Sequence, residues 1–221
     1  MTPFIKVCCI ASVDEAEMAM RAGATALGLV SAMPSGAGVI DDLTIVEVAA
    51  VVPRRMQTFL LTSRTDPDLI AAQLRRAGAN TVQLVDRLGP GAHELLRDLI
   101  PHARVVQVVH VTGPEAVAEA ADVAPLVDAI LLDSGNPTLA VKELGGTGRI
   151  HDWSVSREIV DAVSVPVYLA GGLRAENVGA AIEAVRPAGV DVCTGVRTGG
   201  RLDEAKLGAF MVAVRRAWPA S

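Results

Sequence analysis

Residues 165–196 read VPVYLAGGLRAENVGAAIEAVRPAGVDVCTGV and contain two strand-like runs, each followed by a glycine turn. The first run is Val165–Ala170 and the second is Val190–Thr194. The segment between them, Glu176–Val185, carries apolar residues at helical spacing. A strand, a helix and a second strand in this order predict two parallel strands joined by a crossover helix.

The same alternation extends over the whole chain. Eight such units in 221 residues leave no room for a second domain, so residues 1–221 are predicted to form a single domain of the α/β class, a (β/α)8 TIM barrel. The expected strands are Lys6–Ile10, Ala26–Val30, Gln57–Leu61, Thr81–Val85, Val105–Val109, Ala129–Asp133, Val165–Ala170 and Val190–Thr194. The expected helices are Asp14–Ala22, Leu43–Val52, Asp66–Ala77, His93–Ile100, Glu115–Ala121, Ser156–Val163, Glu176–Val185 and Asp203–Trp218.

An open doubly wound sheet shows the same alternation and is the main rival architecture. Such a sheet would carry a G-x-G-x-x-G turn after its first strand, and none follows Lys6–Ile10. The glycine-rich turns instead follow the last three strands, where barrels of this kind place a phosphate group. The sequence therefore favours the closed barrel.

Composition argues against several classes of partner. The net charge is −5, acidic and basic residues are interspersed, and no Lys/Arg block could follow a nucleic-acid backbone. The start of the chain lacks the regions of a signal peptide, and no apolar run reaches the roughly 18 residues of a membrane helix. We expect a cytoplasmic protein that binds neither nucleic acid nor a membrane.

The three cysteines, Cys8, Cys9 and Cys193, cannot form an even set of disulfides, and adjacent cysteines rarely bridge each other. We therefore expect them to be reduced. Neither the cysteines nor the four scattered histidines show the spacing of a metal site, so no metal is expected.

Two polar residues at strand ends are candidates for catalysis. In a barrel the carboxyl ends of the strands open on one common mouth, so Cys8 near the first strand's end and Asp133 at the end of the sixth could face each other as base and acid. Each has a simpler interpretation. Cys8 could be a small buried apolar residue, and Asp133 could cap the turn that it begins.

The glycine turns are candidates for binding phosphate. Gly171 and Gly172 after the seventh strand, and Thr194 and Gly195 after the eighth, would let backbone N–H groups approach a phosphate dianion. Each turn could also be no more than a tight connection, but their pairing after consecutive strands favours phosphate. Arg197 could add positive charge there, although arginines on a protein surface are usually only solvated.

A third glycine-rich segment, Gly145-Gly146-Thr147-Gly148, follows Asp133 at a distance. It could cover a ligand as a lid, or it could be a flexible linker.

These motifs together resemble the phosphoribosylanthranilate isomerase family of tryptophan biosynthesis. Residues 6–10 (KVCCI) resemble the family's K-[IV]-C-G-[IL], residues 131–134 (LLDS) its L-L-D-S, and residues 145–153 (GGTGRIHDW) its G-G-T-G-x-x-x-D-W. Residues 169–178 (LAGGLRAENV) resemble L-A-G-G-L-x-x-E-N-V, and residues 190–196 (VDVCTGV) resemble V-D-V-S-S-G-V.

The resemblance implies an Amadori rearrangement of an aminoaldose phosphate to an aminoketose phosphate without a cofactor. It implies that Cys8 is the general base that takes the C2′ proton, provided that the site lowers the pKa of its thiol. Asp133 is then the general acid on the ribose ring oxygen. The phosphate would lie on the backbone at Gly171, Gly172, Thr194 and Gly195, and Gly146 and Gly148 would close over it.

The sequence departs from the family pattern at the end that should hold the aromatic acid. The family has S-P-R-Y-V after its second strand, with an arginine for the anthranilate carboxylate, but Ser35–Val39 contains no arginine. We align Gly38 with that arginine and leave open whether Arg54 or Arg55 replaces it. Cys9 stands in place of a glycine, and residues 83–86 (QLVD) stand in place of Q-L-H-G, while Arg197 replaces a glutamate.

Two alternatives to the isomerase stay open at this point. One is a related barrel isomerase for another aminosugar or ketose phosphate, and the other is a phosphosugar-binding protein without catalysis. Every alternative keeps a small sugar phosphate as the ligand. The sequence does not fix the oligomeric state, and a homodimer is one option.

Overall fold

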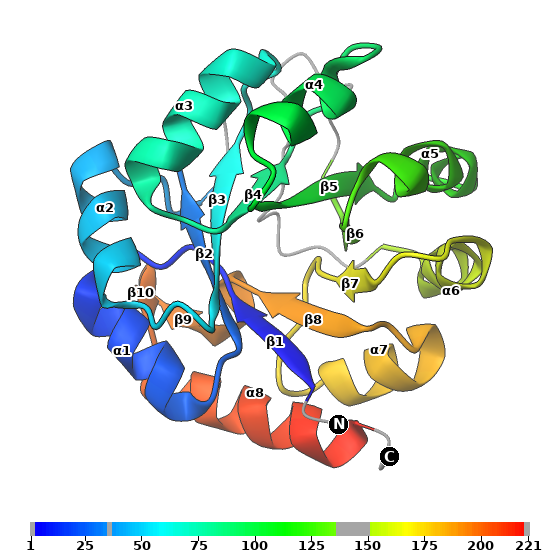
Figure 1. Cartoon of the computed structure of the whole chain (residues 1–221). Coiled ribbons are helices and arrows are strands. Elements are labelled where there is room, and N and C mark those ends of the chain that lie inside the picture. Colours follow the sequence, from blue (N-terminus) through cyan, green and yellow to red (C-terminus); the bar gives the residue numbers. More distant parts are fainter. Residues whose placement is uncertain (1–2, 35–36, 136–150, 219–221) are drawn as a thin grey trace.

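The computed structural model describes residues 3–34, 37–135 and 151–218. Eight parallel strands close into a barrel in chain order, and the helices surround it (Figure 1). The predicted fold class is therefore confirmed. The strands are β1 (Phe4–Val7), β2 (Ala26–Val30), β3 (Gln57–Thr62), β4 (Thr81–Leu84), β5 (Arg104–His110), β6 (Ala129–Asp133), β7 (Val167–Leu169) and β8 (Gly189–Val192).

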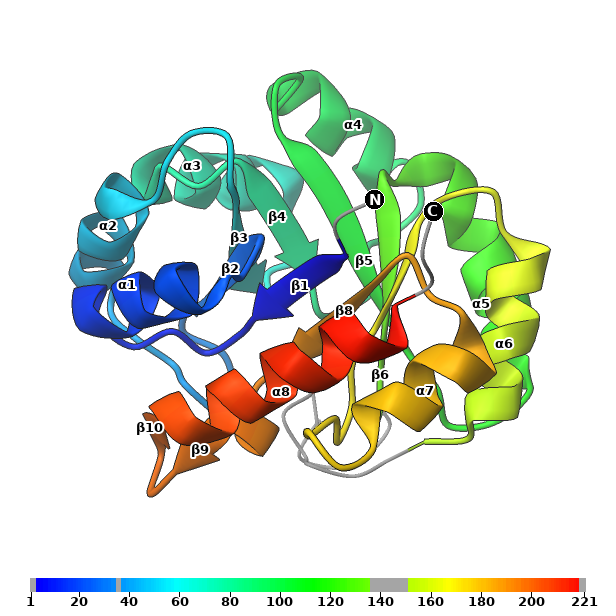
Figure 2. The ribbon, with the colours of Figure 1, turned by 90° about the horizontal axis from the view of Figure 1, so that it is seen from below.

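Each predicted helix is present with small shifts of its ends. The helices are α1 (Val13–Ala22), α2 (Asp42–Val51), α3 (Pro67–Ala77), α4 (Ala92–Leu99), α5 (Glu115–Val123), α6 (Trp153–Ala162), α7 (Val178–Val185) and α8 (Glu204–Ala217). Two 3-10 turns, η1 (Ala124–Leu126) and η2 (Thr194–Val196), add to them. Helix α8 packs against α7 and α1 and so completes the outer ring (Figure 2).

Local capping residues define the ends of two helices. The hydroxyl of Ser12 accepts a hydrogen bond from the backbone N–H of Glu15 and so caps the start of α1. Gly23 and Gly78 end α1 and α3 in the left-handed conformation that glycine tolerates best.

Three features of the chain near the mouth differ from the prediction. Strand β8 ends at Val192, so Thr194 belongs to η2 and not to the strand. Strand β1 ends at Val7, so Cys8 follows the strand instead of belonging to it. A short antiparallel ribbon, β9 (Arg197–Thr198) with β10 (Arg201–Leu202), follows β8 and was not predicted. Its turn is Gly199-Gly200, and both glycines have a positive φ, as tight hairpin turns require.

The barrel has one apolar layer outside the strands and another inside. The outer layer lies between strands and helices, and it is built mainly from Ala, Val, Ile and Leu. The inner layer includes Phe59, Val106, Val108 and Tyr168. Because side chains alternate along a strand, His110 follows Val106 and Val108 on the inner face of β5.

Candidate active site

Cys8 lies at the mouth, the open end of the barrel where the carboxyl ends of the strands meet. Its backbone N–H donates to the carbonyl of Val192 over 2.8 Å, which ties it to β8. Gly28 on β2 leaves room for the thiol, since a Cβ there would lie 2.8 Å from the Cys8 Sγ. The side chain of Cys8 is almost fully buried.

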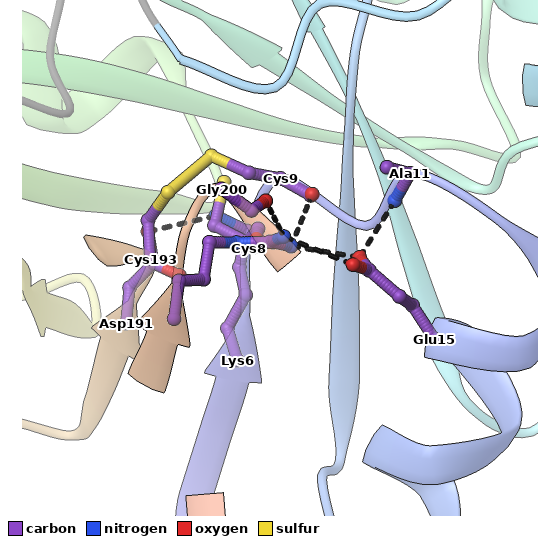
Figure 3. Close-up of a disulfide and its surroundings, with 9 residues drawn as sticks. Lys6, Cys8, Cys9, Ala11, Glu15, Asp191, Cys193 and Gly200 are labelled. Atoms are coloured by element: carbon purple, nitrogen blue, oxygen red, sulfur yellow. Dashed lines mark hydrogen bonds and ion pairs between the residues drawn. A yellow bond between two sulfur atoms is a disulfide. The ribbon is translucent and has the colours of Figure 1, made fainter. Parts of the chain in front are cut away.

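A buried ion pair lies beside Cys8 (Figure 3). Lys6 and Asp191 are register partners on β1 and β8, and the Lys6 Nζ lies 2.8 Å from the Asp191 Oδ2. The Lys6 side chain is completely buried, with its Nζ 5.1 Å from the ring centroid of Phe59. Sequence reasoning missed this pair. The available signal was one charged residue inside each of two apolar strand runs, where burial demands a partner.

The surroundings of Cys8 hold its thiol in the protonated form. Burial raises the pKa of Cys8 to about 11, against the attraction of the Lys6 ammonium and with a further rise from the Asp191 carboxylate. The mechanism inferred from the sequence required a site that lowers the pKa of the Cys8 thiol. The site of the free protein instead raises this pKa. Base function therefore needs a positive charge that forms near the thiol during the reaction.

Asp133 ends β6 at the same mouth, as predicted. One carboxylate oxygen accepts a hydrogen bond from the backbone N–H of Ser134 over 2.7 Å, so the turn interpretation of this residue is also satisfied. Burial nevertheless raises the pKa of Asp133, and the charge of Asp191 adds to the rise, while His110 and Lys6 oppose it. A carboxyl group that keeps its proton longer than usual is suited to act as an acid.

The two glycine turns lie side by side at the ends of β7 and β8. Gly171 and Gly172 have φ values of 80° and 63°, which favour glycine, and both are half-buried. Gly195 approaches the Leu173 carbonyl so closely that any Cβ would overlap it. The Asn177 amide donates to the Gly172 carbonyl over 3.0 Å and so fixes the first turn. The fold thus brings these glycines and Thr194 together beside Asp133.

The guanidinium of Arg197 contacts other groups of the protein. Its guanidinium pairs with Glu15 at the start of α1, with 2.9 Å between Nη2 and Oε2, and also donates to the backbone carbonyls of Cys9 and Gly200. The side chain is largely buried. The suggestion that Arg197 adds free positive charge at the phosphate turns is therefore not supported, because its charge is already neutralised.

The expectation of three reduced cysteines is wrong. Cys9 and Cys193 form a disulfide, with their Cα atoms 5.9 Å apart, and Cys8 is free (Figure 3). The closure of β1 onto β8 brings together two residues 184 positions apart. The bond links the segment after β1 to the turn after β8.

The remaining predicted contacts of the phosphate, Gly146 and Gly148, lie outside the described residues. Within the described ranges, no group of three or more His, Cys, Asp or Glu side chains is placed to hold a metal ion. No helix in those ranges is long and apolar enough to cross a membrane.

Comparison with known families agrees with this geometry. The family model for N-(5′-phosphoribosyl)anthranilate isomerase matches residues 5–213. The chain belongs to the N-(5′-phosphoribosyl)anthranilate isomerase family. It is 37% identical over 209 residues to N-(5′-phosphoribosyl)anthranilate isomerase 2 of Methanosarcina mazei, covering 94% of this chain and 92% of that protein.

Solved structures of the isomerase family share the fold. The enzyme of Thermotoga maritima is similar with a TM-score of 0.81 and 27% identity, over 97% of this chain and 100% of that one. A second isomerase structure, in complex with reduced 1-(o-carboxyphenylamino)-1-deoxyribulose 5-phosphate, has a TM-score of 0.79 and 25% identity over the same shares of the two chains.

The structure also locates the departures from the isomerase family pattern. Arg54 and Arg55 are exposed and precede β3, so they lie at the end of the barrel opposite the mouth and cannot replace the missing arginine. Gly38 has φ 75°, and a Cβ there would come within 2.9 Å of the Cys9 Cα. An arginine at Gly38 would not fit. Counting S-P-R-Y-V from Ser35 places the arginine at Ala37, which is exposed.

Proposed function

We propose that this chain isomerises N-(5′-phosphoribosyl)anthranilate to 1-(2-carboxyphenylamino)-1-deoxyribulose 5-phosphate by general acid and base catalysis. The observation that carries the proposal is the placement of Cys8 and Asp133 at one mouth, on either side of the paired glycine turns. Membership of the isomerase family supports the same reaction, and neither alternative function is favoured by a specific observation.

The first step is ring opening. The Asp133 carboxyl group donates its proton to the ribose ring oxygen, the C1′–O bond breaks, and its electrons remain on the protonated oxygen. The nitrogen lone pair forms a C1′=N iminium ion. The raised pKa of Asp133 favours this step, because more of the acid is protonated at neutral pH.

The second step removes the proton from C2′. The Cys8 thiolate takes the proton, and the C2′–H electrons form a C1′=C2′ double bond while the iminium nitrogen becomes neutral. The resulting enolamine gives the ketone by losing its O2′ proton and gaining one at C1′. The iminium cation favours the Cys8 thiolate, as the Lys6 ammonium already does. Lys6 therefore supports the base without touching the substrate.

Phosphate binding would fix the substrate relative to these two groups. Backbone N–H groups at Gly171, Gly172, Thr194 and Gly195 can donate to the phosphate oxygens, with Gly146 and Gly148 as further proposed contacts. Holding the phosphate beside β7 and β8 places the ribose between β6 and β1, where Asp133 and Cys8 lie.

Turnover of N-(5′-phosphoribosyl)anthranilate by the purified protein tests the proposal. Cys8→Ala and Asp133→Asn should each lower kcat by about a hundredfold or more, the usual scale for one general acid or base. Asp161→Asn, which changes an exposed carboxylate on α6, should leave kcat unchanged. A folded wild-type protein without turnover would refute the function, and full activity of either site variant would refute its role.

The cytoplasmic location and the homodimer remain predictions, each with its own test. A cytoplasmic location is tested by fractionation of the producing cells. The homodimer is tested by light scattering of the purified chain.

A further inference from the structure

His110 is a buried polar side chain at the mouth that the proposed mechanism does not use. It is the last residue of β5 and the register partner of Asp133 on β6. Only 8% of the residue is exposed. Its Nδ1 atom is buried and has no hydrogen-bond partner among the described residues. A buried polar atom without a partner lowers the stability of the fold, so such an atom calls for an explanation.

The hydrogen bond at the other ring nitrogen defines what Nδ1 can do. The Nε2 of His110 lies 3.1 Å from the carbonyl oxygen of Val85. A carbonyl oxygen only accepts, so Nε2 must carry a hydrogen and donate it. Nδ1 is then a bare lone pair in the neutral ring and an N–H donor in the imidazolium. A carboxylate would be bound by the imidazolium form through a charge-assisted hydrogen bond.

The order of strands around the barrel indicates which part of the substrate meets His110. The phosphate turns follow β7 and β8, and the acid and base come from the strands on either side of them, β6 and β1. A substrate held by its phosphate must therefore extend across the mouth toward β2–β5. Its far end is the aromatic acid, and β5 carries His110.

Few cationic groups are available on that side. Four segments connect β2, β3, β4 and β5 to the helices that follow them. The described residues of these segments include two arginines, Arg64 and Arg87. Arg87 pairs with Glu119 on α5 over 3.1 Å, while Arg64 is exposed on the loop after β3. Lys6 and Arg197 are neutralised by Asp191 and Glu15. His110 is the inward-facing candidate, and Arg64 is its rival.

We infer that His110 is the specificity-determining residue that binds the carboxylate of the substrate's aromatic ring, in place of the arginine absent from Ser35–Val39. The inference rests on the proposed function for the identity of the substrate. It gives the buried Nδ1 a partner in a dry site, where a charged hydrogen bond is stronger than in water.

A double-mutant-type cycle, in which the residue and the carboxyl group of the ligand are removed separately and together, tests this contact. The probes are reduced 1-(o-carboxyphenylamino)-1-deoxyribulose 5-phosphate and the same molecule without its carboxyl group, with Kd measured by calorimetry. His110→Phe should weaken binding of the carboxylated probe about ten- to hundredfold, the effect of losing one charge-assisted hydrogen bond. It should change binding of the other probe by less than about threefold. His102→Phe, an exposed histidine at the opposite end of the barrel, should change neither Kd.

Three results would overturn the inference. Equal losses for both probes would mean that His110 acts only on structure, and an unchanged Kd for the carboxylated probe would remove it from binding. A carboxylate-specific loss in Arg64→Ala without one in His110→Phe would assign the contact to Arg64. Because the cycle measures binding, it is independent of turnover. A wild type that binds the carboxylated probe but lacks turnover would refute the proposed function and leave the His110 contact testable.

Discussion

Replacing Asp191 by leucine leaves the ammonium group of Lys6 buried inside the barrel without its carboxylate partner. At the observed 2.8 Å, and with an effective dielectric constant of about 20, the Coulomb attraction between the two charges is about 6 kcal/mol. Part of this offsets the desolvation of both ions. Removal of one partner of a buried pair costs about 3–5 kcal/mol, so Asp191→Leu and Lys6→Met should each lose stability in that range.

The double variant separates the ion pair from simple packing. Lys6→Met with Asp191→Leu removes both charges, so it should be more stable than either single variant, as is usual when apolar residues replace a buried pair. Urea unfolding measures the three losses, provided that the dependence on denaturant is unchanged. The exposed pair Arg157–Asp161 on α6 is the control and should contribute at most about 0.5 kcal/mol. Additive losses at Lys6 and Asp191 would refute the coupling.

Three further predictions concern the mouth. The Cys9–Cys193 disulfide closes a loop of 184 residues, and the loop entropy of the unfolded chain predicts that its reduction lowers the free energy of unfolding by about 5 kcal/mol. A reductant should therefore lower the Tm of the wild type but not the Tm of Cys9→Ser. The rate of alkylation of Cys8, the free thiol, should be low at pH 8 and increase toward pH 11, because a raised pKa leaves less thiolate at a given pH. A rate that stops increasing below pH 9 would contradict the argument that burial raises this pKa. Gly38→Arg should destabilise the fold through its contact with Cys9, whereas Ala37→Arg should keep the Tm and lower KM for the isomerase substrate.

The fold was predictable because its signals are local. A buried parallel strand reads as a short apolar run, and a covering helix reads as a stretch with helical spacing, so the eight units could be counted without knowing their contacts. The ends of α1 are local in the same way, because Ser12 and Gly23 have the residue types that favour the start and the end of a helix. The end of β1 was misplaced because the apolar run continues past Val7, whereas the backbone of Cys9 has a φ of 62°, which an extended strand does not allow.

The contacts across the closure of the barrel were not predictable in the same way. The Lys6–Asp191 ion pair and the Cys9–Cys193 disulfide both join β1 or its end to β8 or its end, across more than 180 positions of the sequence. A local sequence pattern predicts where the strands lie, but it does not predict the register in which β1 pairs with β8. Counting cysteines suggested three free thiols for this reason.

Apart from Arg197, which follows β8, the departures from the family pattern described above lie after β1, β2 and β4. Cys9 occupies space against Gly38, so a side chain gained after β1 faces one lost after β2. Directly after β4, Val85 stands where the family has a histidine, and the imidazole of His110 at the end of β5 contacts the carbonyl of Val85. The turns after β7 and β8 keep the family's glycines. Because each strand supplies its own loop to the mouth, the loops after β1, β2 and β4 can change while the glycine turns after β7 and β8 and Asp133 stay in place.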